Sequence, residues 1–350
     1  MKRIANWALP VLLIGALTTP ALAQAQQAQA ALQQEPKWKD NKEYQDYMVV
    51  YDEKDHAKKA ANAEKFFVDH KDVDPIALTH VFKMMYLGYA NAGNWPKVLE
   101  SYDRMATLGP KLTDAEKQQY TQIALIAAAN SKNNGRTIEI AEKILKDDPN
   151  NFNALITLSG VLSQNLPTTN PQKDAQITRT LEVTKKALAQ PRPQGVADAQ
   201  WNPIQVQLHE TSCLMLLNQI KYQESISECQ AALKLNPKDS FAWYWIGLSH
   251  RAALIDLSKK YNEAVDKYNA NRTAGQLELD ELRAAMQGAE KVASDKRDET
   301  ADAFARSAAI GGDAGKQALN ELQKIFEGTP QGTPQAINEL IEQKKSQLGN

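Results

Sequence analysis

The chain has 350 residues, of which 42 are acidic and 41 are basic, so its formal net charge at pH 7 is −1. Charges of both signs alternate along the predicted helices, which is typical of helix faces in contact with solvent. Because binding to phosphate backbones needs a basic surface, this balance argues against a nucleic-acid-binding protein.

The N-terminus has the three parts of an export signal in the usual order. Lys2 and Arg3 form a basic region, residues 4–17 form an apolar stretch, and residues 21–23 form an Ala-x-Ala cleavage site. The apolar stretch is shorter than the roughly 20 residues that span a bilayer, so a retained membrane anchor is the less favoured interpretation. We therefore expect a signal peptide over residues 1–23 that is cleaved near Ala23. The mature chain is then periplasmic or secreted, without insertion into a membrane.

After the signal peptide, residues 24–34 are nearly all Gln and Ala. This composition cannot bury a core, and residues 24–43 are predicted to form a flexible spacer. From Tyr44 onward the apolar pattern is helical, with no sustained period of two that would indicate a sheet. The fold class predicted from the pattern is therefore all-α.

A degenerate repeat of about 34 residues is clearest over residues 206–239 and closes on Pro237. In the second half of this unit the apolar residues recur at steps of four, three and four, which places them on one helix face. A single helical hairpin cannot cover such a face, so the next hairpin must stack on it. The residues of this stripe are Tyr222, Ile226, Cys229 and Leu233.

Residues 222–237 resemble the second helix of a tetratricopeptide repeat, and Trp243 with Ile246-Gly247 resembles the opening of the next unit. Its second helix is then expected at residues 261–264, after a short insertion. The resemblance implies a right-handed α-solenoid of about six stacked hairpins over residues 44–272. A helical tail over residues 273–350, with helices at 278–310, 316–326 and 334–348, is expected to cap the stack.

The two cysteines lie on either side of the predicted hairpin turn near Lys221, at equal distances from it along the chain. If the helices are antiparallel, Cys213 and Cys229 lie at the same height. They can form a disulfide in an oxidising compartment if both face the hairpin interior. The alternative is that they are two small apolar packing residues.

Sequences that resemble catalytic motifs are incomplete. His209-Glu210 begins like a zinc-protease helix, but Cys213 stands where the second histidine is needed. Residues 311–316 resemble a phosphate-binding loop without its glycine spacing, and the five histidines have no ligand spacing. We therefore predict that the protein is not an enzyme and has no cofactor and no metal site.

In tetratricopeptide proteins the first helices of successive hairpins line a concave face that holds peptides, often through Asn, Lys and Arg. The resemblance implies that four amide side chains occupy one equivalent position near the ends of successive first helices. Amides both donate and accept hydrogen bonds, so such a row can hold an extended backbone. The alternative is that polar residues simply end the helices. The four residues are Asn91, Asn130, Gln164 and Asn218.

The same comparison places Phe241, Tyr244 and Arg251 on the concave face of the clearest unit, with Glu210 beside them. An exposed aromatic residue next to an arginine is a typical interface anchor. In the alternative, Phe241 and Tyr244 pack against the charged tail, which folds back into the groove.

These features predict an exported, non-enzymatic adaptor or scaffold that binds protein or peptide partners in the cell envelope through its concave surface. An alternative is a binding protein or accessory subunit for a small envelope ligand, such as a glycan or a peptidoglycan fragment. That ligand would use the aromatic cluster from Trp243 to Trp245.

Overall fold

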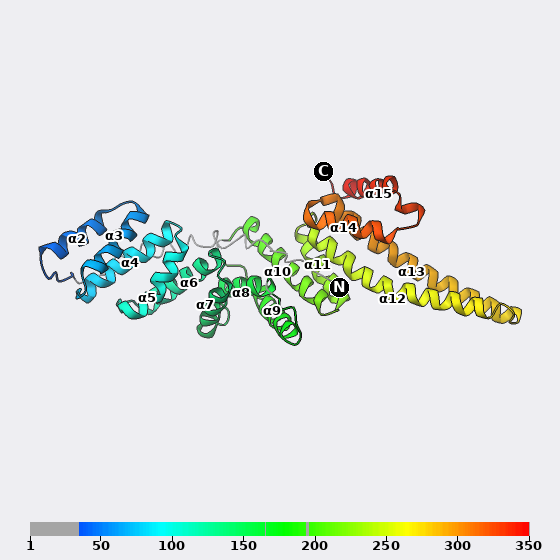
Figure 1. Ribbon diagram of the computed structural model, residues 1–350, viewed down its shortest axis with the longest axis horizontal. Coiled ribbons are helices and arrows are strands. Elements are labelled where there is room, and N and C mark those ends of the chain that lie inside the picture. The colour runs from blue at the N-terminus through cyan, green and yellow to red at the C-terminus, as the bar shows by residue number, and fades with distance from the viewer. Residues whose placement is uncertain (1–34, 165, 194–195, 350) are drawn as a thin grey trace. The chain divides into compact units, whose positions relative to one another are not determined.

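The structure is a computed structural model that describes residues 35–164, 166–193 and 196–349. In these residues the secondary structure is helical and contains no strand (Figure 1). The chain divides into two compact units between residues 165 and 166. The predicted signal peptide and most of the predicted spacer lie outside the described residues. Among the helices that are described, none is long and apolar enough to cross a membrane.

The first unit is a series of helices in which each packs mainly against the next along the chain. The expected all-α arrangement of helical hairpins is confirmed here. The helices are α2 (Asn41–Asp52), α3 (His56–Asp69), α4 (Pro75–Asn91), α5 (Trp95–Leu108), α6 (Asp114–Asn130), α7 (Asn134–Asp147) and α8 (Phe152–Gln164).

The repeat period in the first unit is longer than the sequence pattern predicts. Helices α3, α5 and α7 begin at residues 56, 95 and 134, while α4 and α6 begin at residues 75 and 114. We call this constant spacing between equivalent helices the long period. The extra length lies in the link between hairpins, which runs from Gly109 to Thr113 between α5 and α6. The shorter predicted period describes the unit at residues 206–239, where the sequence pattern is clearest.

Capping side chains determine where the helices of the first unit begin, and residues with a left-handed backbone form the turns of its hairpins. The turn between α4 and α5 has Gly93 at φ 67°, and the equivalent turn between α6 and α7, one long period later, has Lys132 at φ 54°. A β-carbon makes this conformation unfavourable, so glycine is the better residue there. The helices start at side chains that accept a backbone N–H bond, namely Asp40, Asp55, Asp74, Asn94, Thr113 and Asn133 for α2 to α7.

Aromatic residues fill the core of the first unit. Phe82, Tyr86 and Tyr120 contact one another, and the Tyr86 hydroxyl donates a 2.8 Å hydrogen bond to the Tyr120 carbonyl oxygen. Gly88 allows α4 to approach α3, because a β-carbon there would lie 2.9 Å from the backbone oxygen of His56. The close packing of α4 on α3 therefore requires a residue without a side chain at position 88.

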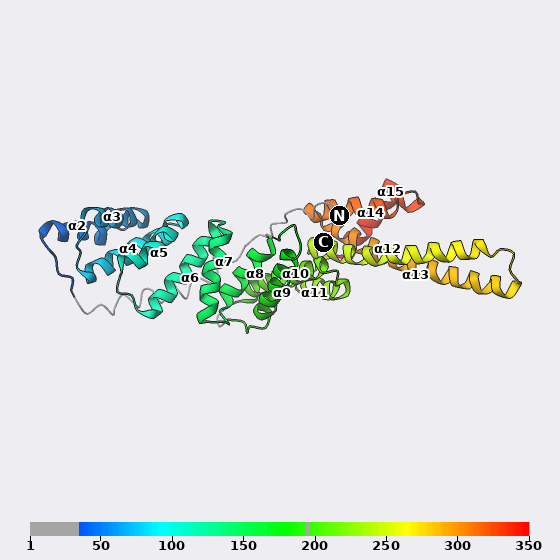
Figure 2. The same ribbon diagram turned by 60° about the horizontal axis from the view of Figure 1, so that its bottom comes forward.

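The second unit contains two much longer helices (Figure 2). Its elements are α9 (Gln172–Leu188), α10 (Asp198–Asn218), α11 (Tyr222–Leu235), α12 (Ser240–Ala270), α13 (Gln276–Ile310), α14 (Gly312–Ile325), the short helix η2 (Pro330–Gly332) and α15 (Pro334–Gln347). The three tail helices α13, α14 and α15 begin and end close to the predicted bounds.

The prediction of a second helix at residues 261–264 is wrong. These residues lie inside α12, which continues for 31 residues and packs antiparallel to α13. We call residues 252–298 of this pair the arm. Along both of its helices the facing residues recur at steps of three and four, which is the seam of a coiled coil. They are Leu254, Leu257, Tyr261, Ala264 and Tyr268 in α12, and Leu279, Leu282, Met286, Ala289 and Ala293 in α13.

The second helix of the sixth hairpin is instead the end of α13. Its buried residues Thr300, Phe304 and Ser307 have the spacing that Ser225, Cys229 and Ala232 have in α11. A β-carbon on Gly247 would lie 2.5 Å from the Phe304 ring, and the Ser307 hydroxyl donates a 2.8 Å bond to the Ser240 carbonyl oxygen. The sixth repeat is therefore interrupted by the arm, and residue 272, the predicted end of the solenoid, lies in the connection at the arm's tip.

Candidate functional site

The four predicted amide residues are equivalent in the structure. Each is the last residue of a first helix, namely Asn91 of α4, Asn130 of α6, Gln164 of α8 and Asn218 of α10. The Asn130 amide donates a 3.0 Å bond to the Ile126 carbonyl oxygen, and the Asn218 amide donates a 2.9 Å bond to that of Leu214. Both therefore satisfy the end of their own helix, as the alternative interpretation expects. A contact between this row and a partner stays a prediction.

The tail covers the face on which Phe241, Tyr244 and Arg251 were expected to be open. Tyr244 is only 9% exposed, and the centroid of its ring lies 5.8 Å from that of Phe304 in α13. Arg251 forms an ion pair with Glu321 of α14, and the half-buried Phe241 contacts Trp245. The physical reason is the interrupted repeat, because the end of α13 must pack on α12 to complete the hairpin. A partner can reach Tyr244 only if the tail helices move away.

The aromatic cluster expected to bind sugars is also engaged within the chain. Trp245 is buried, and the indole of Trp243 donates a 3.2 Å bond to the Pro237 carbonyl oxygen. The Arg306 guanidinium lies over the Trp243 ring, 5.0 Å from its centroid. These rings therefore stabilise the sixth hairpin and its tail, and they do not form an open aromatic platform.

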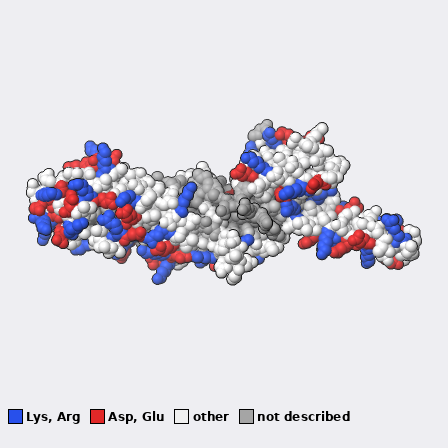
Figure 3. Space-filling model, in the orientation of Figure 1, with Lys and Arg blue, Asp and Glu red and all other residues white. Residues whose placement is uncertain are grey.

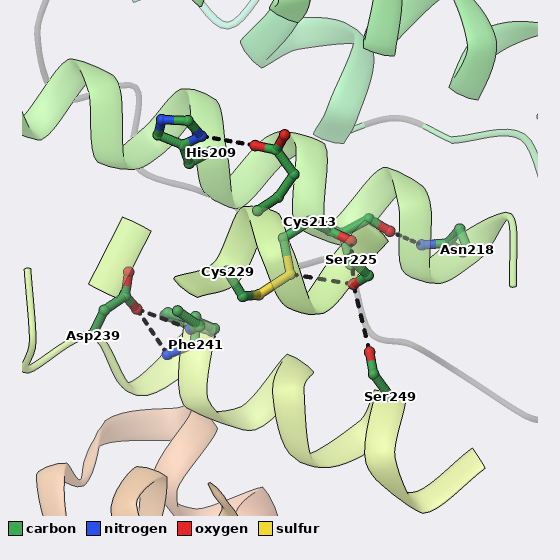
Figure 4. Close-up of a disulfide and its surroundings, with 11 residues drawn as sticks. His209, Cys213, Asn218, Ser225, Cys229, Asp239, Phe241 and Ser249 are labelled. Atoms are coloured by element: carbon green, nitrogen blue, oxygen red, sulfur yellow. Dashed lines mark hydrogen bonds and ion pairs between the residues drawn. A yellow bond between two sulfur atoms is a disulfide. The ribbon is translucent and has the colours of Figure 1, made fainter. Parts of the chain in front are cut away.

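Glu210 is buried next to Asp239, the residue that caps α12. Asp239 accepts bonds of 2.9 and 3.1 Å from the backbone N–H groups of Phe241 and Ala242, through Oδ1 (Figure 4). Burial, followed by repulsion from Asp239, raises the pKa of Glu210 well above its ordinary value. A protonated Glu210 can donate a hydrogen bond to the buried Asp239 carboxylate, so Glu210 has a structural role in the junction between α10 and α12.

Cys213 and Cys229 form a disulfide that joins α10 to α11, with their Cα atoms 5.3 Å apart. Both residues are fully buried, and the Ser225 hydroxyl donates a 2.9 Å bond to the Cys213 carbonyl oxygen. The Ser249 hydroxyl of α12 reaches that of Ser225 at 3.5 Å (Figure 4). The bridge and its hydroxyl neighbours therefore tie three successive helices together.

His209 has a carboxylate partner and no metal-binding neighbours. Its Nδ1 lies 2.7 Å from a carboxylate oxygen of Glu228 in α11. Across the described residues, no group of three His, Cys, Asp or Glu side chains is placed to hold a metal ion. On the face shown in Figure 3, basic and acidic side chains are interspersed, as expected for solvated helix faces.

A surface hollow in the first unit was not predicted. It has a volume of about 460 Å³ and lies between α5 and α7, above the start of α6. Its size is in the range of pockets that bind ligands or side chains of a partner. The lining consists of Met105, Ala106, Gly109, Pro110, Leu112 and Ile140, with a polar rim of Tyr102, Asp103, Lys117, Arg136, Glu139 and Lys143.

The rim of the hollow is ordered by ion pairs. Arg136 of α7 bonds to Asp103 of α5 and, at 2.6 Å, to Glu139 of its own helix. The hydrogen bond to Glu139 raises the pKa of Arg136 despite partial burial. Lys143 donates a 2.9 Å bond to the Tyr102 hydroxyl. The sequence signal that could have revealed this rim is an acid followed by a base once in each long period, at 64–65, 103–104 and 142–143.

Comparisons with known proteins found helical-repeat structures of low similarity. No protein-family model and no curated protein matches the chain. Similar solved structures include the C-terminal part of a TPR repeat-containing protein from Cytophaga hutchinsonii, with 9% identity, a TM-score of 0.40, and coverage of 85% of this chain and 98% of that one. A MamA mutant has 18% identity and a TM-score of 0.36, covering 50% and 87%. The TPR2AB domain of yeast Sti1 in complex with pHSP90 has 11% identity and a TM-score of 0.27, covering 71% and 98%. These identities and TM-scores support no conclusion about partner or function.

Proposed function

We propose that the protein is an exported, non-enzymatic adaptor that binds protein or peptide partners in the cell envelope. The observation that carries this proposal is a repeated surface on the first helices of the first unit. Met84, Leu87 and Asn91 of α4 lie at steps of three and four. One long period later, α6 repeats the pattern as Ile123, Ile126 and Asn130.

Half-buried apolar side chains beside an exposed amide are the composition of a contact surface. Met84, Leu87, Ile123 and Ile126 are all half-buried, although their helices have fully buried residues on the next face. Apolar side chains supply contact area, and the amides fix the register of an extended segment through hydrogen bonds. The equal spacing in α4 and α6 allows one partner segment to use both helices in the same way.

Photo-crosslinking in intact cells tests this proposal. We would place a photoreactive amino acid at Leu87 or at Ile126 in the full chain, with the exposed Lys65 of α3 as the control position. The proposal expects that both probes capture the same envelope protein and that the control does not. Capture of the same bands from Lys65, or of nothing from either probe, would contradict it.

The predicted export has its own measurement. Mass analysis of the protein recovered from the periplasmic fraction or the medium should show a chain that begins after Ala23. A chain that retains Met1 and is found only in the cytoplasm would refute the envelope part of the proposal, whatever the crosslinking shows.

A small glycan ligand remains a second candidate because of an aromatic strip formed by Trp38, which precedes α2, and three tyrosines of α2. The rings of Trp38 and Tyr44 are 5.8 Å apart, those of Trp38 and Tyr47 4.6 Å, and those of Tyr47 and Tyr51 5.9 Å. Tyr44 is 39% and Tyr51 57% exposed. Aromatic faces of this kind can stack on sugar rings. Quenching of tryptophan fluorescence by a peptidoglycan disaccharide, lost in a Trp38→Phe variant, would support this candidate, and no change with the sugar would exclude it.

A further inference from the structure

The hollow between α5 and α7 has an equivalent place one repeat earlier. Helices α3, α4 and α5 correspond to α5, α6 and α7 when they are shifted by one long period. Each junction contains an ion pair between residues 33 positions apart. Lys97 pairs with Glu64 at 2.9 Å in the earlier junction, and Arg136 pairs with Asp103 in the later one. The two junctions can therefore be compared residue by residue.

The first difference between the junctions is apolar volume. Phe66 and Phe67 of α3 are buried rings. At the corresponding positions α5 has a half-buried Met105 and an exposed Ala106, both of which line the hollow. Replacing a phenylalanine by an alanine removes a whole ring, and no other described side chain fills the space of about 460 Å³. The later junction therefore lacks an apolar group that the earlier one contains.

The second difference is charge. In the earlier junction Glu64 has two cationic neighbours, Lys97 at 2.9 Å and Arg104 at 3.6 Å, and it accepts a 2.7 Å bond from the Tyr89 hydroxyl. Burial alone would raise the pKa of Glu64, but the bonds from Tyr89 and Lys97 outweigh it and lower that pKa. The Glu64 carboxylate therefore has two ion-pair partners and a hydrogen-bond donor within the chain.

In the later junction one cationic side chain, Lys143, has no carboxylate partner among the described residues. Arg136 takes both Asp103 and Glu139, whereas Lys143, which corresponds to Arg104, bonds to the neutral Tyr102 hydroxyl. No carboxylate of the described chain lies within ion-pair distance of Lys143. The exposed ammonium group is therefore available to an anion from outside the chain.

We propose that this hollow is a docking site for an acidic segment of a partner protein. A large apolar side chain of that segment, such as phenylalanine, fills the space above Ala106, and a neighbouring carboxylate pairs with Lys143. An open hollow with an apolar floor and an ion-paired rim is the kind of place where an anchor residue binds. The site lies on the second helices α5 and α7, so it is separate from the contact surface on α4 and α6.

The methyl group of Met105 gives a direct readout by NMR. The full mature chain, with isotope-labelled methionine methyls, would be titrated with a blocked peptide that contains Phe-Asp-Glu between serines. Peptides with Ala-Asp-Glu or Phe-Lys-Lys in its place are the controls, and a Met105→Leu variant assigns the signal. We expect a saturable shift of the Met105 signal with the first peptide. The dissociation constant should be at least about tenfold higher with the Ala-Asp-Glu peptide, because that peptide lacks the ring that fills the apolar pocket. It should also be higher with the Phe-Lys-Lys peptide, because repulsion from Lys143 replaces an exposed ion pair.

Two variants complete the test. Ala106→Phe introduces the residue that the preceding repeat already holds, so the fold is expected to tolerate it while the hollow is filled and binding is lost. Lys143→Met removes an exposed ion pair and should weaken binding by up to about fivefold. An absence of saturable shifts, equal binding of the Phe-Lys-Lys peptide, or unchanged binding by Ala106→Phe would overturn the proposal. A shift produced by decanoate but not by the acidic peptide would overturn it as well, in favour of a small amphiphile.

Discussion

The buried carboxyl pair of Glu210 and Asp239 makes the stability of the second unit depend on pH. The folded state raises the pKa of Glu210 well above the value of 4.5 that it has in an unfolded chain. The folded state therefore binds more protons than the unfolded state in the pH range between the two pKa values. Its free energy of unfolding must decrease as the pH rises through that range. Within that range, each pH unit lowers the free energy of unfolding by up to about 1.4 kcal/mol.

A Glu210→Gln variant removes this dependence. The glutamine amide can donate a hydrogen bond to the Asp239 carboxylate without a proton that titrates. As the pH rises above 5, the wild type should lose unfolding free energy relative to the variant, with a slope that approaches about 1.4 kcal/mol per pH unit. The titrating groups that do not interact with this pair are common to both proteins and cancel in the difference.

Urea denaturation followed by tryptophan fluorescence measures this difference, because Trp243 and Trp245 lie in the same hairpin. The exposed Glu224, changed to Gln, is the matched control in the neighbouring helix α11. The control should have the same pH profile as the wild type. If wild type and Glu210→Gln give parallel profiles over this range, the reasoning about the buried pair is refuted.

Two further predictions concern packing and the disulfide. Gly247→Ala should lower the free energy of unfolding by about 1–3 kcal/mol, because its β-carbon meets the Phe304 ring. The matched change Gly288→Ala in the arm has open space around the new atom and should raise helix stability by up to about 1 kcal/mol. Thermal denaturation compares the two, and equal losses would contradict the packing argument. Removal of the Cys213–Cys229 bridge should cost about 3 kcal/mol, since it closes a loop with a sequence separation of 16. Intact mass after alkylation without reductant should show no labelled thiol, and two labels would disprove the bridge.

The helices themselves could be predicted from local pattern. The period of the apolar residues marks α11, and the Gly-Gly and Gly-x-Pro segments mark the ends of the tail helices. The continuation of α12 through Tyr261 could not be read in the same way, because a heptad seam and a repeat helix have nearly the same period. The choice between them is made by packing with α13, whose contacts with α12 are distant in sequence.

The candidate sites show the same limit. The row that includes Asn91 and Asn130 was located correctly at the helix ends, since hairpin position follows from spacing. The burial of Tyr244 was not predictable, because it depends on Phe304, which lies beyond the whole arm in the chain. The hollow was missed because it consists of an absent side chain. Only the comparison of Ala106 with Phe67, one long period earlier, reveals what is lacking there.

Because the arm is an insertion in the sixth repeat, its helices can change in length without affecting the packing of the stacked hairpins. The contact between Gly247 and Phe304 fixes the base of the arm. Beyond this contact the arm is a two-helix coiled coil whose facing residues repeat by heptads. Removing one heptad from each helix would preserve the facing residues and shorten the arm by about 10 Å, at about 1.5 Å per residue. The length of the arm can therefore change by whole heptads without a change in the hairpin at its base.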